Sequence, residues 1–108
     1  MNADGEIVVL ITAPDQETAH EIATYLVEKR LAACVNLISP IQSIYSWEGE
    51  IHLDEEILLL VKTRQELFEN QLLPAVKARH PYQLPEVIAL PIQVGSAEYL
   101  HWIRESTR

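Results

Sequence analysis

The residues best suited to metal chemistry in this sequence are four histidines and a single cysteine. Imidazole and thiolate are ligands of transition metals, so these side chains are the first to consider for a metal site. No two of the histidines lie at the i, i+4 spacing that would place both on one face of a helix. These side chains are His20, Cys34, His52, His80 and His101, and we assign no role to His20 and His101, which lie on expected helices among polar neighbours.

His80 is one candidate metal ligand, because a neutral imidazole binds transition metals. It follows Arg79 and precedes Pro81 at the expected end of a helix. One imidazole per chain can bind a metal at a subunit boundary, where another copy supplies further ligands. The alternative is a helix-terminal histidine that interacts favourably with the helix dipole. Cys34 lies in an apolar run, and we interpret it as a small buried hydrophobe.

A second group combines aromatic and charged side chains. We interpret its aromatic members as packing or interface anchors, because aromatic side chains dominate such contacts. Lys62 lies in an apolar strand run and needs a partner, for which Glu56 and Glu86 are the candidates in a half-buried ion pair. The alternative is a cleft between subunits. Its walls would be formed by Tyr45, Trp47, Glu56, Lys62, Tyr82, Glu86 and Trp102.

Signatures of catalysis are missing from the sequence. It contains no nucleophile–base pair, no glycine-rich phosphate loop and no paired His/Cys spacing. We therefore predict no catalytic residue and no enzymatic activity. The enzymatic alternative is a small ferredoxin-like phosphatase that holds an anion with Arg30 and Asn36. We interpret Arg30 instead as a cation that ends a helix and compensates its dipole.

Length and charge limit the partners. The 108 residues are enough for one domain, residues 1–108, with a core of its own. The net charge of −8 and the lack of a basic run argue against nucleic acid. No apolar run approaches the roughly 18 residues of a membrane span, so we expect no membrane partner. The polar lead MNADGE has no signal-peptide pattern, and the cytoplasm is the expected location.

The stretch from Leu31 to Thr63 predicts a long antiparallel hairpin with its tip at Gly49. At about 3.3 Å per residue, a continuous strand over Ala33–Trp47 would be about 50 Å long. This exceeds the roughly 35 Å diameter of a domain of this size. Pro40 cannot donate to a sheet ladder, so we expect the first strand to break or bulge there.

The outer part of this hairpin is apolar beyond the reach of a single core. Exposed strands of this kind aggregate unless something covers them. The residues concerned are Ile44, Tyr45, Trp47, Ile51 and Leu53. We therefore predict a closed homo-oligomer. At the tip, the alternating Glu48, Glu50 and His52 can hold a hard cation weakly, and the alternative is a solvated tip.

Periodicity and capping signals predict the remaining elements. The expected strands outside the hairpin are Ile7–Thr12 and Glu86–Val94, the second an edge or bulged strand at Pro91. The first expected helix is Asp15–Arg30. The second begins at the capping box Thr63–Glu66 and runs to Arg79, with a kink at Pro74. The third is short and is capped by Ser96.

The order β-α-β-β-α-β-α predicts an α+β fold, a ferredoxin-like βαββαβ sandwich. Its antiparallel sheet would carry helices on one face, a long hairpin between the second and third strands, and an extra C-terminal helix. The other face of the sheet would be open and apolar. This is a second reason to expect self-association.

Five motifs spread over the chain together resemble the CutA family of divalent-cation tolerance proteins. The match covers about Val8 to Ile103. The motifs are Arg30-Leu31-Ala32-Ala33-Cys34-Val35-Asn36, Ser43-Ile44-Tyr45-Ser46-Trp47-Glu48-Gly49, Glu56 with Lys62-Thr63, His80-Pro81-Tyr82 with Pro85-Glu86, and Tyr99-Leu100-His101-Trp102-Ile103.

The resemblance implies a ferredoxin-like protomer in a tight homotrimer similar to PII signalling proteins. It also implies a cytoplasmic role in tolerance to copper and other divalent metals, with Cu²⁺ or another divalent cation bound weakly. Family members described as copper-binding carry a cysteine in the first strand and a His-His pair before Pro-Tyr. Here Ile11 and Arg79 occupy the first two of these positions and only His80 is retained, so the resemblance implies His80 as the metal ligand of this chain. A PII-like trimer can instead bind a small anionic effector between protomers, near Lys62 and Tyr82, with an indirect link to metals.

Overall fold

The computed structural model describes residues 5–108. The predicted domain, residues 1–108, also includes residues 1–4, which lie outside the described residues. The elements are β1 (Glu6–Ala13), α1 (Gln16–Glu28), β2 (Cys34–Trp47), β3 (Glu50–Arg64), a 3₁₀ turn (Gln65–Leu67), a π-helical turn (Phe68–Leu72), α2 (Leu73–Arg79), β4 (Val87–Pro91) and α3 (Ala97–Ser106). None of the helices within residues 5–108 is long and apolar enough to cross a bilayer.

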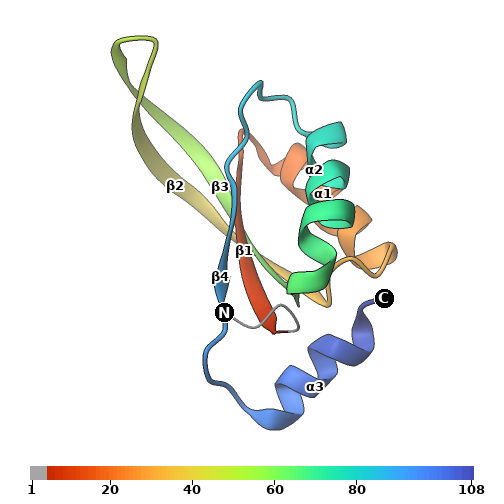
Figure 1. Ribbon diagram of the computed structural model, residues 1–108. Helices are drawn as coiled ribbons and strands as arrows, with labels where there is room; N and C mark the ends of the chain where they lie inside the picture. Colours follow the sequence, from red (N-terminus) through yellow and green to blue (C-terminus); the bar gives the residue numbers. More distant parts are fainter. Residues whose placement is uncertain (1–4) are drawn as a thin grey trace.

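The four strands form one antiparallel sheet in the order β2-β3-β1-β4. The helices α1 and α2 lie on one face of this sheet, and the hairpin of β2 and β3 projects beyond the rest of the molecule (Figure 1). The helix α3 lies at the end of the molecule opposite the hairpin tip. This arrangement confirms the predicted ferredoxin-like fold with an extra C-terminal helix.

Local signals account for α1. Asp15 precedes the helix in an extended conformation, and its carboxylate accepts a hydrogen bond from the Thr18 N–H at 2.8 Å, which lowers the pKa of Asp15. The helix ends at Glu28, two residues before the predicted end, because Arg30 has a left-handed φ of 59°. The buried residues face the sheet at helical spacing and are Ala19, Ile22, Ala23 and Leu26.

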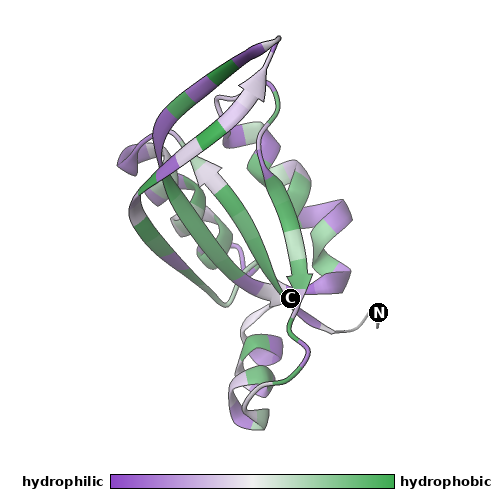
Figure 2. Ribbon diagram, turned by 90° about the vertical axis from the view of Figure 1, so that its left-hand side faces the viewer, coloured by the Kyte–Doolittle hydropathy of each residue, from purple (hydrophilic) through white to green (hydrophobic). Residues whose placement is uncertain are grey.

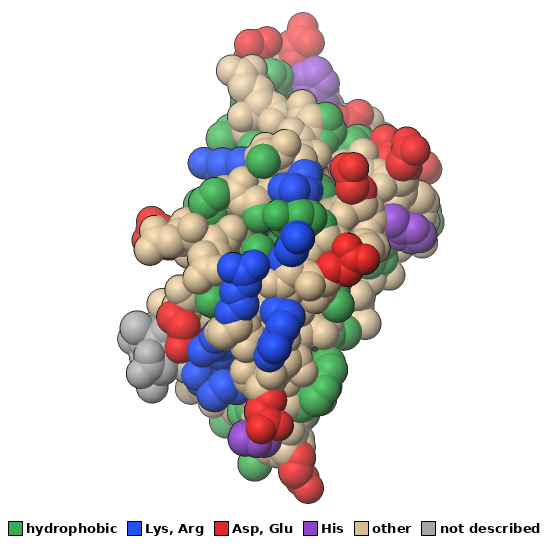
Figure 3. Space-filling model, turned by 90° about the vertical axis from the view of Figure 1, so that its right-hand side faces the viewer, with side chains coloured by type: hydrophobic (Ala, Val, Ile, Leu, Met, Phe, Trp, Pro, Cys, Tyr) green, Lys and Arg blue, Asp and Glu red, His purple; other side chains and the backbone are tan. Residues whose placement is uncertain are grey.

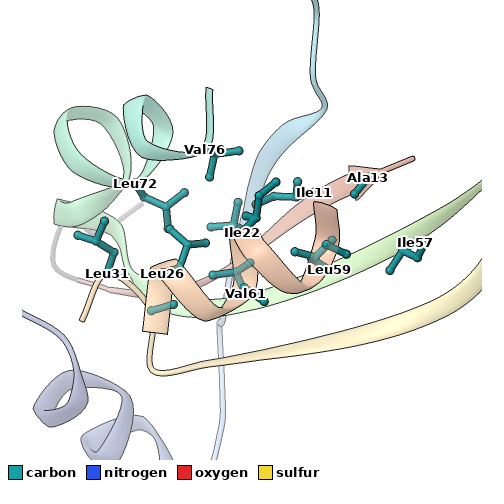
Figure 4. Packing of buried hydrophobic residues seen from close by; sticks show 14 of the residues in the cluster. Ile11, Ala13, Ile22, Leu26, Leu31, Ile57, Leu59, Val61, Leu72 and Val76 are labelled. Carbon is teal, nitrogen blue, oxygen red and sulfur yellow. The ribbon is translucent and has the colours of Figure 1, made fainter. Parts of the chain in front are cut away.

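The core lies between the sheet and these two helices (Figure 4). Alternate residues of β1 and β3 point into it, and α1 and α2 close it from the other side. Complete burial of one such aliphatic side chain contributes about 1.5–3 kcal/mol. The residues with at most 2% exposure in this cluster are Ile7, Val9, Ile11, Ala19, Ile22, Leu26, Leu59, Val61, Leu72 and Val76, together with Ala13 and Ala32.

The hairpin has the predicted tip and the predicted bulge. Trp47 pairs with Glu50 across a two-residue turn, Glu48-Gly49, in which both residues have positive φ, 51° and 82°. Two positive φ values match the twist of the flanking strands, and glycine adopts them without strain. The register shifts between Ile38 and Ile41, around Pro40. The hairpin makes the molecule elongated, with extents of 43 × 26 × 25 Å.

The predicted capping box at Thr63 is wrong. Thr63 is the last but one residue of β3, where it pairs with Ile7 of β1. Its side chain is fully buried, and its hydroxyl donates a hydrogen bond to the Leu31 carbonyl at 2.7 Å. The sheet ladder therefore extends through the position that the local pattern assigns to a helix start.

The second helical segment is also less regular than predicted. A 3₁₀ turn and a π-helical turn precede α2, so Pro74 lies in the first turn of α2. Proline has no N–H to donate to a carbonyl of the π-helical turn that directly precedes α2. The predicted kink at Pro74 thus takes the form of a change from π-helical to α-helical hydrogen bonding.

The strand β4 lies at the sheet edge, as Pro91 predicts, but it is shorter than the predicted Glu86–Val94. Pro91, which has no N–H, is its last residue and pairs with Ile7. The chain then reaches Ser96, whose hydroxyl oxygen accepts a hydrogen bond from the Tyr99 N–H at 3.4 Å and caps α3 as predicted.

The helix α3 is attached to the domain at several points. Ile103 is fully buried, and Arg104 forms a 2.7 Å salt bridge with Glu6. The Arg30 guanidinium donates to the carbonyls of Glu105 at 2.7 Å and Ser106 at 3.4 Å. Arg30 therefore compensates the dipole of α3. The sequence predicted instead that Arg30 compensates the dipole of the preceding helix, α1.

Replacement of Thr63 by valine tests the buried hydrogen bond that ends β3. Thr63→Val keeps the shape of the side chain but leaves the Leu31 carbonyl without this donor, so we expect the free energy of unfolding to fall by about 1–3 kcal/mol. Urea unfolding at a fixed protein concentration measures the change. The matched control is Thr24→Val on the exposed face of α1, which should change stability by less than about 0.5 kcal/mol. Equal stability of the two variants would contradict the assignment.

Candidate functional site

A cavity of about 710 Å³ lies between the outer half of the hairpin and the loop that follows α2. This volume is within the range of about 300–1,000 Å³ that is typical of small-molecule sites. Residues 43–47 of β2, Glu56 of β3 and residues 81–84 of the loop line most of it, with Thr12 and Glu86. Five of the seven predicted cleft residues thus line one cavity: Tyr45, Trp47, Glu56, Tyr82 and Glu86.

Glu56 and Tyr82 connect the two walls of the cavity. The Tyr82 hydroxyl donates a 2.7 Å hydrogen bond to Oε2 of Glu56, which is only 6% exposed. Burial of the phenol and its hydrogen bond to the carboxylate raise the pKa of Tyr82 well above its ordinary value. Tyr82 is therefore a neutral donor at physiological pH, and Glu56 accepts its hydrogen bond.

Tyr45 makes a similar contact on the hairpin. It pairs with His52 across the ladder and stacks on the His52 ring, with 5.4 Å between ring centroids. Its hydroxyl donates to a carboxylate oxygen of Asp54, and this hydrogen bond raises the pKa of Tyr45. Two neutral phenols and two carboxylate acceptors therefore lie at this part of the hairpin.

The electrostatic character of the cavity is acidic. Within the described part of the chain its walls include two carboxylates, Glu56 and Glu86, and no Lys, Arg or His. Lys and Arg side chains gather instead over the helical side of the molecule (Figure 3). An anion in this cavity would therefore meet like charge.

His80 has a structural role that the sequence did not reveal. Its ring is buried, Nε2 lies 2.7 Å from the Thr12 carbonyl, and Nδ1 lies 3.2 Å from the Tyr82 N–H. A backbone N–H can only donate, so Nδ1 is the acceptor and Nε2–H donates to Thr12 in the neutral ring. Both nitrogens have backbone partners and fix the Tyr82 loop to β1. A metal bound by His80 would have to displace one of them, so its metal-ligand role stays a prediction.

Lys62 and Trp102 lie away from the cavity. Lys62 pairs with Cys34 and Val8, six residues along β3 from Glu56, which is about 20 Å in a strand. Among residues 5–108 its side chain has no ion-pair partner, so the predicted pair with Glu56 or Glu86 is not formed. Trp102 packs against Tyr99 of α3. Lys62, farther along β3, and Trp102, on α3, are therefore separate from the five residues that line the cavity.

The other candidate ligands do not converge on one point either. Within residues 5–108, no three His, Cys, Asp or Glu side chains are close enough together to hold a metal ion. Glu48 and Glu50 are exposed at the tip, and His52 stacks on Tyr45. Cys34 is partly buried and weakly contacts Asn36. One described chain therefore supplies fewer than three such ligands to any common site.

The second functional surface is the sheet face without helices, which we call the open face. The hydrophobic strands of the sheet face the viewer in Figure 2, with the helices behind them. Half of the side chain is exposed at Ile88 and Leu90 of β4, and slightly less at Ile38 of β2. The overhanging hairpin exposes more, 72% of Ile44 and 75% of Ile51. Both features were predicted from the sequence.

Comparison with known families gives a match over nearly the whole chain. A family model described as CutA1 divalent ion tolerance protein matches residues 7–106. The divalent-cation tolerance protein CutA of Thermus thermophilus is 56% identical over 102 residues, which cover 94% of this chain and 98% of that protein. Protein CutA of Homo sapiens is 50% identical over 101 residues, 90% of this chain and 54% of that protein. The chain thus spans about half the length of the human relative.

Solved structures give the same result. CutA1 from Oryza sativa has a TM-score of 0.92 at 44% identity, with 99% of this chain and 98% of that chain covered. The protein described as periplasmic divalent cation tolerance protein CutA from Archaeoglobus fulgidus has a TM-score of 0.91 at 45% identity, with 95% and 99% covered. The resemblance seen in the sequence motifs is therefore confirmed. This chain belongs to the CutA1 family of divalent ion tolerance proteins.

Proposed function

We propose that this chain acts as a homotrimer in tolerance to copper and other divalent metal ions, and that it binds such cations weakly. Membership of the CutA1 family supports the role, because relatives are named divalent-cation tolerance proteins. A cytoplasmic site of action and the absence of enzymatic activity stay predictions from the sequence.

The observation that supports assembly is the open face of the sheet. The central strands β1 and β3 are apolar on both faces, but α1 and α2 cover only one of them. Burial of apolar surface is worth roughly 25 cal/mol per Å², so a second layer over the open face would be strongly stabilising. Closed rotational symmetry buries the same surface in every copy and leaves no copy uncovered. The number three comes from the family resemblance.

The scattered ligands support the proposal that a single copy binds cations weakly rather than tightly. A divalent ion that prefers imidazole or thiolate usually needs three or four protein ligands. The described residues of one copy do not bring three together. In a symmetric assembly, equivalent side chains from several copies can complete such a site. Cation binding would then depend on assembly.

A second candidate function is that of a small-ligand sensor with an indirect link to metals. The cavity between the hairpin and the Tyr82 loop favours it, because it has the size of a ligand site and contains a buried carboxylate. Lys62, the cation expected to attract an anionic effector, is not among the lining residues. The sensor is therefore proposed here without an anionic ligand.

A charge on the open face tests the assembly. Leu90 is 54% exposed in the single chain, so Leu90→Asp should leave the protomer folded but place a charge in a subunit interface. We expect sedimentation velocity to show species near the protomer mass of 12.3 kDa at micromolar concentration. Val27→Asp on α1, where Val27 is 42% exposed, is the matched control and should sediment as the unmodified chain does. Identical sedimentation of all three proteins would contradict an interface at the open face.

Replacement of His80 separates its structural role from metal binding. Because both ring nitrogens have backbone partners, His80→Ala should lower the free energy of unfolding by about 1–3 kcal/mol. Calorimetric titration with Cu²⁺ tests the predicted metal-ligand role, which requires the folded variant to lose copper binding. His20→Ala, at an exposed position of α1, is the control for general loss of a histidine. Loss of the copper signal in folded His80→Ala but not in His20→Ala supports the ligand role, and an isotherm identical to that of the unmodified protein would remove His80 from the site.

A further inference from the structure

We propose that the cavity between the hairpin and the Tyr82 loop binds a small organic cation, such as a primary or quaternary amine. This inference rests on the second candidate function, a small-ligand site in the cavity, and names its ligand class. It differs from the anionic effector that the resemblance to PII proteins implies. Three independent features of the cavity support it.

The first feature is the sign of the charge. Glu56 and Glu86 line the cavity, and Asp54 lies beside it in hydrogen-bond contact with Tyr45. Within the described residues no basic side chain lines the cavity to neutralise these carboxylates. The negative potential of such a site attracts cations and repels anions.

The second feature is an unused acceptor. Glu56 is 6% exposed, and only its Oε2 receives a hydrogen bond, from the Tyr82 hydroxyl. Among residues 5–108 no donor reaches Oε1. Oε1 is not fully enclosed by the described residues, so a ligand in the cavity can reach it, and an ammonium N–H supplies a donor together with a compensating charge.

The third feature is the aromatic lining. Tyr45, Trp47 and Tyr82 contribute three aromatic rings to the cavity walls. The faces of such rings attract an organic ammonium within about 6 Å, and several rings around one cation form a recognised cage. The hydrogen bonds of the two phenols to Asp54 and Glu56 hold these rings in place. A hydrated metal ion gains little from ring faces and needs more oxygen ligands than the walls offer.

The two tryptophans allow a direct test, because Trp47 lines the cavity and Trp102 lies on α3. In the full-length Trp102→Phe variant, Trp47 is the sole tryptophan and reports on the cavity by fluorescence. We expect saturable changes on titration with choline and with putrescine, and none with glutamate at equal ionic strength. The Trp47→Phe variant, which retains only Trp102, should show no change with any of them.

Carboxamide variants identify the carboxylates. In the single-tryptophan background, Glu56→Gln should weaken putrescine binding about tenfold or more, because a charge-assisted hydrogen bond is lost. Glu86→Gln should also weaken it while it leaves the contact between Glu56 and Tyr82 intact. Glu21→Gln, at an exposed position of α1, removes the same charge elsewhere and should leave the affinity unchanged.

The outcomes distinguish the ligand class from the site itself. Saturable binding of both amines that Glu56→Gln and Glu86→Gln weaken supports the proposal. Binding of glutamate without binding of the amines would overturn the organic cation but retain the sensor. No response to any probe up to millimolar concentration would overturn both. Equal weakening by Glu21→Gln would show general charge attraction and would also overturn the site.

Discussion

The structure depends on a sheet whose two central strands are apolar on both faces. In β1 and β3, residues such as Val9 and Leu59 point toward the helices, while Leu10 and Leu60 point the other way. The helices α1 and α2 pack their apolar faces against the side chains that point toward them and leave the opposite face of the sheet uncovered. The open face and the overhanging hairpin therefore both carry apolar surface that a single copy of the chain leaves exposed. Additional copies of the chain are the simplest way to cover this surface.

The same hairpin creates the candidate site. Because β2 and β3 extend beyond the core, their outer half forms a wall opposite the loop that follows α2. His80 fixes that loop through two backbone hydrogen bonds, and Tyr82 then reaches Glu56. The result is a buried carboxylate in an aromatic cavity beside the outer half of a projecting hairpin. A site at this place can link ligand binding to the arrangement of neighbouring copies, since both involve the hairpin.

Most of the fold could be predicted from the sequence, because its signals are local. The Asp15 cap, the turn at Gly49 and the bulge at Pro40 each depend on residues within a few positions of one another. The capping pattern at Thr63 failed because pairing with Ile7, more than fifty residues away, outweighed it. Likewise, no local pattern shows that the His80 ring is held by Thr12 and Tyr82. The sequence identified five residues that line the cavity but did not show that Lys62 lies away from them. Lys62 and Glu56 are on the same strand, but Lys62 lies six residues farther along it.

The central claim is that other copies of the chain cover the open face. The mass in solution tests it most directly, measured by multi-angle light scattering of the unmodified chain over a dilution series. The account predicts three protomers of 12.3 kDa each in every particle, with no dissociation in the micromolar range. A particle of 12.3 kDa with hairpin amides still protected from hydrogen exchange would contradict it, because the apolar ribbon would then be stable without a partner.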